Sequence, residues 1–178
     1  ILDKRYGSYA ISVTNFAATN LYREDGFSVT AADSYQFDNL VSRPVLSYGA
    51  NLKYLRRSFS TDERTNNDPI FQDRRASDAF TMDLGLMIHP HFQTLPGLKL
   101  GLVAQNITEP NIGLSSTDRI PAKYVFGVTY QDPHFRYLNP TLDIYRRRGR
   151  TVVAGALESW FAQETLALRF GGNRDQIG

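Results

Sequence analysis

The sequence predicts an all-β fold and, within that class, an antiparallel transmembrane β-barrel. Apolar residues recur at every second position through nine segments, and seldom at the three- and four-residue spacing of an amphipathic helix. The positions between them are rich in Gly, Ser, Ala and Thr, with isolated charges. Aromatic residues make up 12% of the chain although its mean hydropathy is −0.36, which fits a sheet with one lipid-facing side and one polar side.

The first four segments alternate most clearly. They cover residues 7–16, 27–37, 45–59 and 77–89. In the fourth, an unbroken apolar row consists of Phe80, Met82, Leu84, Leu86 and Ile88. The positions between carry Thr81, Asp83, Gly85 and His89. Because successive side chains of a strand point to opposite faces, each segment is expected to have one apolar face.

Five more segments follow. They cover residues 97–107, 120–131, 140–147, 150–161 and 163–172. In the sixth segment of the chain, the apolar side carries Tyr124, Phe126, Val128 and Tyr130. The eighth segment is less regular, with Val153, Leu157 and Phe161 expected on its apolar side. Alternating segments of about ten residues, separated by turn residues, are typical of a membrane barrel.

A soluble antiparallel sandwich or a lipocalin-type barrel also alternates, so the polar side has to separate the classes. In a soluble sandwich that side meets bulk water and is rich in Lys, Glu and Thr. Here it is rich in small residues with scattered charges, which suits a crowded polar lumen. The composition therefore favours the membrane barrel.

The connections alternate between long and short. Residues 17–26, 60–76 and 108–119 form longer polar connections, and residues 38–44 and 90–96 form shorter ones. Outer-membrane barrels have short periplasmic turns and longer outer loops. We therefore expect residues 60–76 and 108–119 to face outside. The turns at 148–149 and 162–163 are both tight, so their length does not indicate which side of the membrane they face.

Nine strands is an odd number, whereas bacterial single-chain barrels usually have an even one. We therefore expect residues 1–178 to be one barrel domain that is incomplete at one or both ends. Residues 1–5 do not form a basic-then-apolar leader.

Several function classes are disfavoured. With 20 basic and 18 acidic residues, the net charge of +2 argues against a nucleic-acid binder. The absence of Cys excludes thiol catalysis and Cys-ligated zinc. His89 and His91 flank Pro90 at a turn, where a surface turn is a better interpretation than a metal site. No Ser-His-Asp order and no phosphate loop is present. We expect no enzyme activity, no cofactor and no metal.

The middle and end of the chain carry a series of short strand motifs. In order, they are SYGANLKY (47–54), MDLGLM (82–87), LGLVAQNI (100–107), IPAKYVFGVTY (120–130), LDI (142–144), AGALESWF (154–161) and LALRFG (166–171). In this order and spacing they resemble the PorV-like branch of the FadL-like outer-membrane proteins. The resemblance covers roughly residues 45–173.

The resemblance implies a barrel of about fourteen strands, of which about nine are visible here. The N-terminal plug of FadL itself has no counterpart in this sequence. PorV-like members serve protein secretion and surface attachment in some bacteria. The resemblance therefore implies a bacterial outer-membrane protein acting as a structural, docking or secretion-linked component of an envelope assembly. Its expected partners are outer-membrane lipid, lipopolysaccharide and other envelope proteins.

Two other functions stay open from the sequence. One is a FadL-like channel for small hydrophobic molecules, and the other is a soluble β-sandwich binding module.

Seven charged residues are expected on the polar, lumen-facing side: Lys53, Asp83, Lys99, Lys123, Asp143, Glu158 and Arg169. Ion pairs that hold the strands in register and fill the lumen are one interpretation, and a polar pathway or ligand site is the other. The first is favoured, because a small barrel must fill its interior.

Two further groups lie near predicted strand ends. Arg146, Arg147, Arg148 and Arg150 form a basic cluster at a hairpin tip, which is either a headgroup contact or an ordinary solvated turn. Aromatic residues that fit an interfacial girdle are Tyr54, Tyr124, Tyr130, Trp160 and Phe161.

Overall fold

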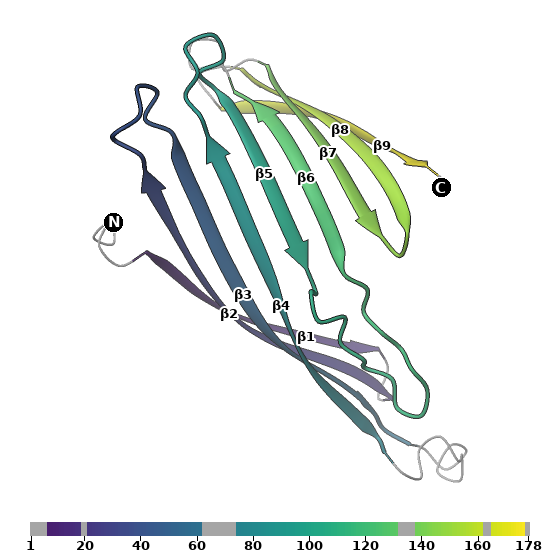
Figure 1. Ribbon diagram of the computed structural model, residues 1–178. Helices are drawn as coiled ribbons and strands as arrows, with labels where there is room; N and C mark the ends of the chain where they lie inside the picture. Colours follow the sequence, from purple (N-terminus) through teal and green to yellow (C-terminus); the bar gives the residue numbers. More distant parts are fainter. Residues whose placement is uncertain (1–6, 19–20, 62–73, 132–137, 162–164, 177–178) are drawn as a thin grey trace. The chain divides into compact units, whose positions relative to one another are not determined.

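The part of the chain that the structure describes forms one antiparallel sheet of nine strands, each paired with its neighbours in the sequence (Figure 1). The computed structural model describes residues 7–18, 21–61, 74–131, 138–161 and 165–176. The strands are β1 (Ser8–Ala18), β2 (Tyr22–Gln36), β3 (Val45–Phe59), β4 (Ala76–His89), β5 (Leu98–Gln105), β6 (Lys123–Tyr130), β7 (Asn139–Arg147), β8 (Arg150–Phe161) and β9 (Leu166–Gln176). This confirms the all-β prediction. In the described ranges there is no helix long and apolar enough to cross a membrane.

All nine predicted strands are present, and the bounds of β3 and β8 match the prediction. The largest difference is at β2, which begins at Tyr22, although residues 22–26 were expected in a loop. Charged residues occupy this part of the strand because neighbouring strands supply partners for them: Asn15 donates to Asp25, and Arg57 donates to Glu24. At the other end of the chain, β9 continues to Gln176, beyond the predicted end at residue 172.

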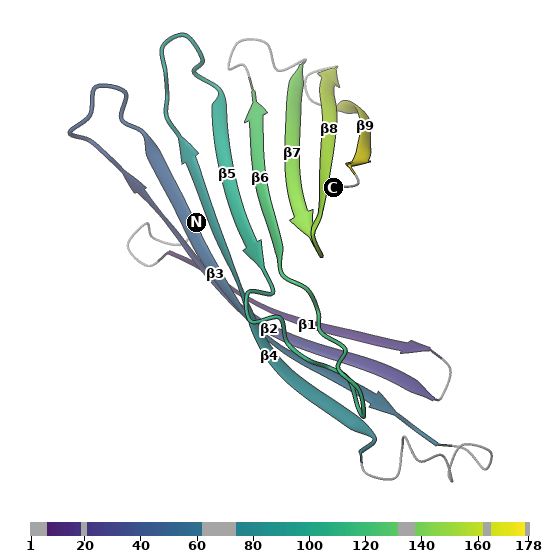
Figure 2. The same ribbon diagram turned by 45° about the vertical axis from the view of Figure 1, so that its right-hand side comes forward.

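The chain divides into two compact units. The first contains residues 1–31, 50–83 and 105–122, and the second contains residues 32–49, 84–104 and 123–178. Strands β2, β3 and β4 contribute residues to both, and β5 contributes Gln105 to the first and its other residues to the second. The connection between β5 and β6, residues 106–122, is an extended loop that belongs to the first unit (Figure 2).

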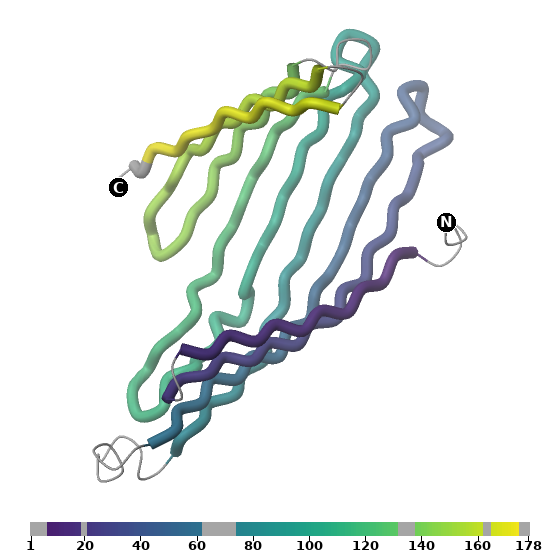
Figure 3. The backbone as a smooth tube through the Cα atoms, turned by 180° about the vertical axis from the view of Figure 1, so that it is seen from behind, coloured from purple at the N-terminus to yellow at the C-terminus, as the bar shows by residue number. Residues whose placement is uncertain are grey.

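In the second unit, the register of β6 to β9 shows which side chains share a face. The backbone can be followed from β6 in green to β9 in yellow in Figure 3. Phe126, Ile144 and Val153 form one cross-strand row. The adjacent row consists of Gly127, Asp143 and Ala154. Because cross-strand partners lie on one face and successive residues alternate, the first row belongs to an apolar face and the second to a polar face.

The same alternation runs through β4 and β5, where Leu86 pairs with Leu102 and Met87 pairs with Gly101. We use the name apolar face for the side that carries Leu84, Leu102 and Phe126 in the second unit and Leu52 and Phe80 in the first. We use the name polar face for the side that carries Lys123, Asp143 and Glu158 in the second unit and Asn51, Lys53 and Arg57 in the first.

No described part of the chain covers the apolar face. Leu84 is 43% exposed, Leu102 is 53% exposed and Phe126 is 42% exposed. In the first unit, Leu52 and Phe80 are also exposed. Apart from prolines, the buried apolar side chains among the described residues are Ile112, Ala122 and Val152. Within the described ranges, therefore, no apolar layer of the kind that normally covers one face of a soluble antiparallel sheet is present.

Gly97, just before β5, lies close to Gln131, just after β6, and this contact can be tested by substitution. Its carbonyl accepts a hydrogen bond from the Gln131 amide at 3.0 Å, and a Cβ atom at Gly97 would lie 1.6 Å from the Gln131 carbonyl oxygen. We predict that Gly97→Ala lowers the free energy of unfolding by about 1–3 kcal/mol, because the two backbones must move apart. The measurement is the urea midpoint, followed by the fluorescence of Trp160, the single tryptophan.

The control is Gly85→Ala, because a Cβ atom there meets nothing within 4 Å. Equal midpoints for the two variants would show that the Gly97–Gln131 approach is not part of the folded state.

Candidate functional site

Residues 105–122 lie on the polar face of β3 and β4 in the first unit. At the start of this segment, the Asn106 amide donates to Asp83 at 2.9 Å, and Lys53 Nζ donates to the Asn106 side-chain oxygen at 2.6 Å. The next residues bond to the β4 backbone: the Ile107 amide donates to the Met82 carbonyl, and the Thr108 hydroxyl donates to the Phe80 carbonyl. The segment is therefore attached along β4 as soon as it leaves β5.

Lys53 and Asp83 form an ion pair at this attachment. Their charged groups are 2.6 Å apart, and their side chains are 20% and 18% exposed. Asn51 Nδ2 donates to Asp83 at 3.3 Å, and Thr30 donates to Asn51 at 3.1 Å. Polar contacts thus run from β2 across β3 to β4. Two of the seven charges expected on the polar face meet here.

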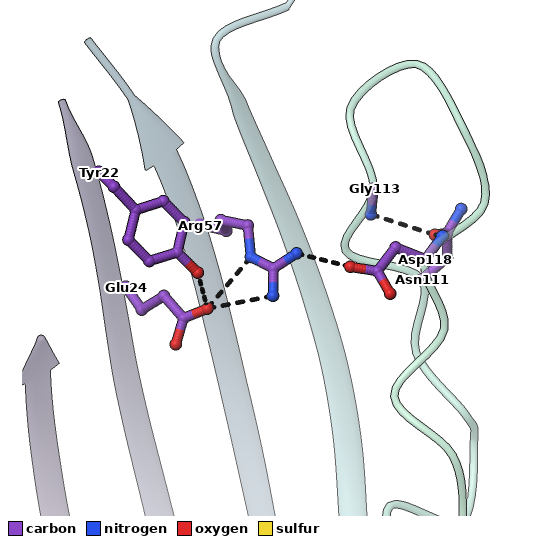
Figure 4. A network of polar contacts seen from close by, with 6 residues as sticks. All are labelled: Tyr22, Glu24, Arg57, Asn111, Gly113 and Asp118. Carbon is purple, nitrogen blue, oxygen red and sulfur yellow. Dashed lines mark hydrogen bonds and ion pairs between the residues drawn. The ribbon is translucent and has the colours of Figure 1, made fainter. Parts of the chain in front are cut away.

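Arg57 is the second attachment, and Figure 4 shows its contacts. Its Nε donates to Glu24 on β2 at 3.1 Å, and its Nη1 donates to Asp118 in the 105–122 segment at 2.7 Å. Tyr22 also donates to Glu24, and its ring lies 5.9 Å from the guanidinium group. The Arg57 side chain is 21% exposed. Arg57 therefore joins β2, β3 and the segment through charge-assisted hydrogen bonds.

Contacts inside the segment fix the position of Asp118. The Asn111 side-chain oxygen accepts hydrogen bonds from the amides of Gly113 and Asp118, at 3.1 Å and 2.8 Å. The Ile112 amide donates to the Asp118 carbonyl, and the Ile120 amide donates to the Pro110 carbonyl. At the base of the loop, Glu109 accepts a hydrogen bond from the Ala122 amide. Asp118 is thereby presented to Arg57 from an internally bonded loop.

This arrangement adds to two sequence-based interpretations. Residues 108–119 were expected to face outside as a loop, and the side that they face stays a prediction. The structure adds that Arg57 and the backbone of β4 hold these residues on the sheet. Sequence reasoning placed Arg57 on the polar side but gave it no role. Its partners Glu24 and Asp118 were both assigned to loops, so only the structure shows that they meet.

A cleft of about 400 Å³ lies between the segment and the strands of the first unit. Its lining includes apolar and charged side chains, among them Phe16, Glu24, Leu55, Arg57, Ile112 and Ile120. The cleft could hold a small molecule with an apolar part.

Glu158 and Arg169 form the second ion pair among the seven predicted charges. They are cross-strand partners on β8 and β9. Trp160 Nε1 donates to Glu158 at 2.5 Å, and the Arg169 guanidinium group lies 5.7 Å from the Trp160 ring. Trp160 therefore belongs to the polar face, and its assignment to an interfacial girdle is wrong.

The other three predicted charges have no ion pair within the described ranges. Lys123 Nζ lies 4.4 Å from the centre of the Tyr145 ring. Asp143 lies opposite Gly127 on β6 and Ala154 on β8. Lys99 lines a second cleft, of about 300 Å³, together with Glu158 and Arg169. The predicted network is thus realised as two separate pairs, each inside one unit.

The four arginines lie at the turn between β7 and β8. Arg148 and Gly149 form the two-residue connection, with φ values of 51° and 76°, which suits the right-handed twist of a hairpin. Arg147 pairs with Arg150, and Arg146 pairs with Thr151. All four side chains are exposed, and none forms an ion pair in the described part of the chain.

His89 and His91 both form hydrogen bonds to backbone carbonyl groups. His89 Nε2 donates to the Pro96 carbonyl at 2.8 Å, and His91 Nδ1 donates to the Arg43 carbonyl at 3.0 Å. The two rings lie 3.7 Å apart. The contacts serve the turn itself, whereas His134 lies outside the described residues.

We predict that Arg57→Met releases the loop from β2 and β3. Because this partly exposed group contributes about 1 kcal/mol, the amides of Ile112 and Ile120 should exchange hydrogen about fivefold faster. Hydrogen exchange measured by mass spectrometry or NMR gives the rates. Arg56→Met is the matched control, because Arg56 is its exposed neighbour and lies 3.8 Å from Asp78. Equal rates in the two variants would contradict the anchoring role of Arg57.

We predict that Asp83→Ala lowers the free energy of unfolding by about 1–3 kcal/mol, because Lys53 and the Asn106 amide lose their acceptor. The double variant Lys53→Met with Asp83→Leu should recover most of this loss, because it removes both charges. Urea midpoints give the coupling energy, and Lys99→Met serves as the unpaired control. Strictly additive effects of Lys53→Met and Asp83→Leu, each also measured alone, would show that the pair is not coupled.

Comparisons with known proteins find no match for this chain. No protein-family model matches the sequence, no curated protein matches it, and no solved structure matches the fold.

Proposed function

We propose that the chain is a large part of a bacterial outer-membrane β-barrel of the FadL-like, PorV-like type. In this proposal it is not an enzyme. It acts as a structural, docking or secretion-linked component of an envelope assembly, with outer-membrane lipid, lipopolysaccharide and other envelope proteins as partners. The observation that carries the proposal is the uncovered apolar face on consecutive strands.

The apolar face is difficult to reconcile with a water-exposed sheet. A soluble monomer rarely exposes an apolar patch larger than a few hundred Å². Here the rows Leu86–Leu102 and Phe126–Ile144–Val153 both lie on the face that no described residue covers. Hydrocarbon chains of a bilayer can cover such a face, because lipid supplies the apolar contacts that a second protein layer would otherwise provide.

The polar face supports an enclosed interior. It carries a polar loop and ion pairs between neighbouring strands. Contact of these groups with lipid would cost free energy, whereas the polar interior of a barrel can hold them. Neighbouring strands of a β-sheet also hydrogen-bond each other's backbone N–H and C=O groups, which is required of any chain inside a bilayer. The edge strands β1 and β9 of the described sheet would need partners in the closed barrel.

The loop favours a structural or docking role over transport. Residues 105–122 occupy the polar face of the first unit and are attached through Asp83 and Arg57. A loop held there fills space that a solute would otherwise use.

The cleft beside Leu55, Ile112 and Ile120 favours one second candidate, a channel for small hydrophobic molecules. Uptake of a labelled fatty acid into liposomes that contain the chain would support this candidate, and no uptake above empty liposomes would reject it.

We predict that Leu102→Arg lowers the free energy of unfolding in phosphatidylcholine vesicles by about 2–4 kcal/mol, because a cation would face hydrocarbon. In water, a substitution at this half-exposed site would change the free energy of unfolding by only about 0.5 kcal/mol. Urea titration of the vesicle-bound chain, followed by Trp160 fluorescence, measures the difference.

Leu102→Ala is the control at the same site, because it removes apolar area without adding charge. If Leu102→Arg costs no more than Leu102→Ala, lipid does not contact this position. A chain that stays folded, soluble and monomeric without detergent or lipid would support the soluble β-sandwich module instead.

A further inference from the structure

The cleft of about 300 Å³ on the polar face of the second unit lies where β5, β7 and β9 begin and β6 and β8 end. All of its lining residues belong to that unit. Most of them are polar, and they include Lys99, Thr129, Gln131, Thr141, Glu158 and Arg169. The cleft of the first unit has more apolar residues in its lining, so the two clefts suit different ligands.

Short side chains form the floor of this cleft. Thr129 on β6 pairs with Thr141 on β7, and Ala156 follows on β8. The Thr141 hydroxyl donates to the Thr129 oxygen at 3.0 Å, and the Thr129 hydroxyl donates to a β7 backbone carbonyl at 3.2 Å. Because the floor is low, Lys99 on β5 and Arg169 on β9 line the same cleft, although β6, β7 and β8 separate their strands.

The charged residues of the lining are two cations and one carboxylate. Glu158 already accepts hydrogen bonds from Trp160 Nε1 and from Arg169 Nε. The terminal nitrogens of Arg169 carry further N–H donors, and the Lys99 ammonium group has donors but no acceptor. The Arg169 side chain is 68% exposed, which leaves these donors open to a ligand. The lining therefore has an excess of positive charge and of donors.

This excess indicates an anion with oxygen acceptors. Two cations that line one cleft repel each other, and an anion between them turns the repulsion into attraction. Guanidinium and ammonium groups form charge-assisted hydrogen bonds to carboxylate and phosphate oxygens. Gln131 and Thr141 add polar groups for the remaining oxygens of such a ligand. The volume of the cleft is at the lower end of the range for ligand sites, so the ligand must be small.

We propose that the cleft between Lys99 and Arg169 binds a small hydrophilic oxyanion, either a carboxylate or a phosphate. The site goes beyond the structural role proposed above, because it gives the polar face a ligand of its own. It also does not depend on the layer that covers the apolar face, since every residue of the lining belongs to one unit. Failure to bind an anion would therefore leave the membrane proposal untouched.

The test measures the binding of two probes, inorganic phosphate and malonate, to the chain in neutral detergent micelles. Trp160 is the single tryptophan and is bonded to Glu158, so its fluorescence reports on the cleft. Titration calorimetry gives a second readout that does not depend on Trp160. Sodium chloride at equal ionic strength controls for screening, and glycerol controls for neutral solutes.

We expect saturable binding of at least one probe, and three variants with opposite effects. Lys99→Gln should weaken binding at least about tenfold, because the anion loses a charged donor. Glu158→Gln should tighten binding about threefold, because it removes the like charge while the glutamine oxygen still accepts from Trp160. Lys123→Gln should leave binding unchanged, because Lys123 lies about 20 Å along β6 from Thr129, beyond the Debye length of about 10 Å at about 0.1 M salt.

Saturation by phosphate alone or by malonate alone would support the inference and identify the class of oxyanion. Four results would overturn it. A signal that chloride reproduces at equal ionic strength would show screening alone. Equal weakening in Lys99→Gln and Lys123→Gln would show an effect of net charge. Weaker binding by Glu158→Gln would show that the carboxylate helps to hold the ligand. Saturation by glycerol would indicate a site for neutral solutes.

Discussion

The two-residue period of a β-strand is the constraint on which the rest of the structure depends. It places Leu84, Leu102 and Phe126 on one face, and no described part of the chain covers that face. The hydrophobic effect then requires a covering layer from outside the described chain. The function proposed for this protein follows from the nature of that layer, because lipid on this side would cover the apolar rows.

The polar face is organised by pairs between neighbouring strands. Lys53 with Asp83 and Glu158 with Arg169 each join adjacent strands, and a one-residue slip in register would separate both pairs. Arg57 extends the same principle to a loop, because it holds Asp118 as well as Glu24. These contacts specify register and loop position, which a sheet with mostly small residues on its polar side would otherwise define only weakly.

The sequence predicted the strands well, because each one alternates over enough residues to be distinguished from a helix. It predicted which charges share the polar face, but not their partners, since a pair such as Glu158–Arg169 depends on register. The start of β2 was missed because Arg23, Glu24 and Asp25 have the composition of a loop. The role of Arg57 and the polar position of Trp160 depend on contacts across strands, for which a single sequence carries no signal.

The most direct test of the account is the contact between the apolar face and hydrocarbon. The chain has no cysteine, so single cysteines can carry spin labels without further changes. Labels at positions 84, 102 and 126 should be more accessible to oxygen than to a water-soluble nickel complex when the chain is in phosphatidylcholine vesicles. Labels at positions 85, 101 and 127, on the opposite face, should show the reverse. Equal nickel accessibility at both sets of positions would contradict the account.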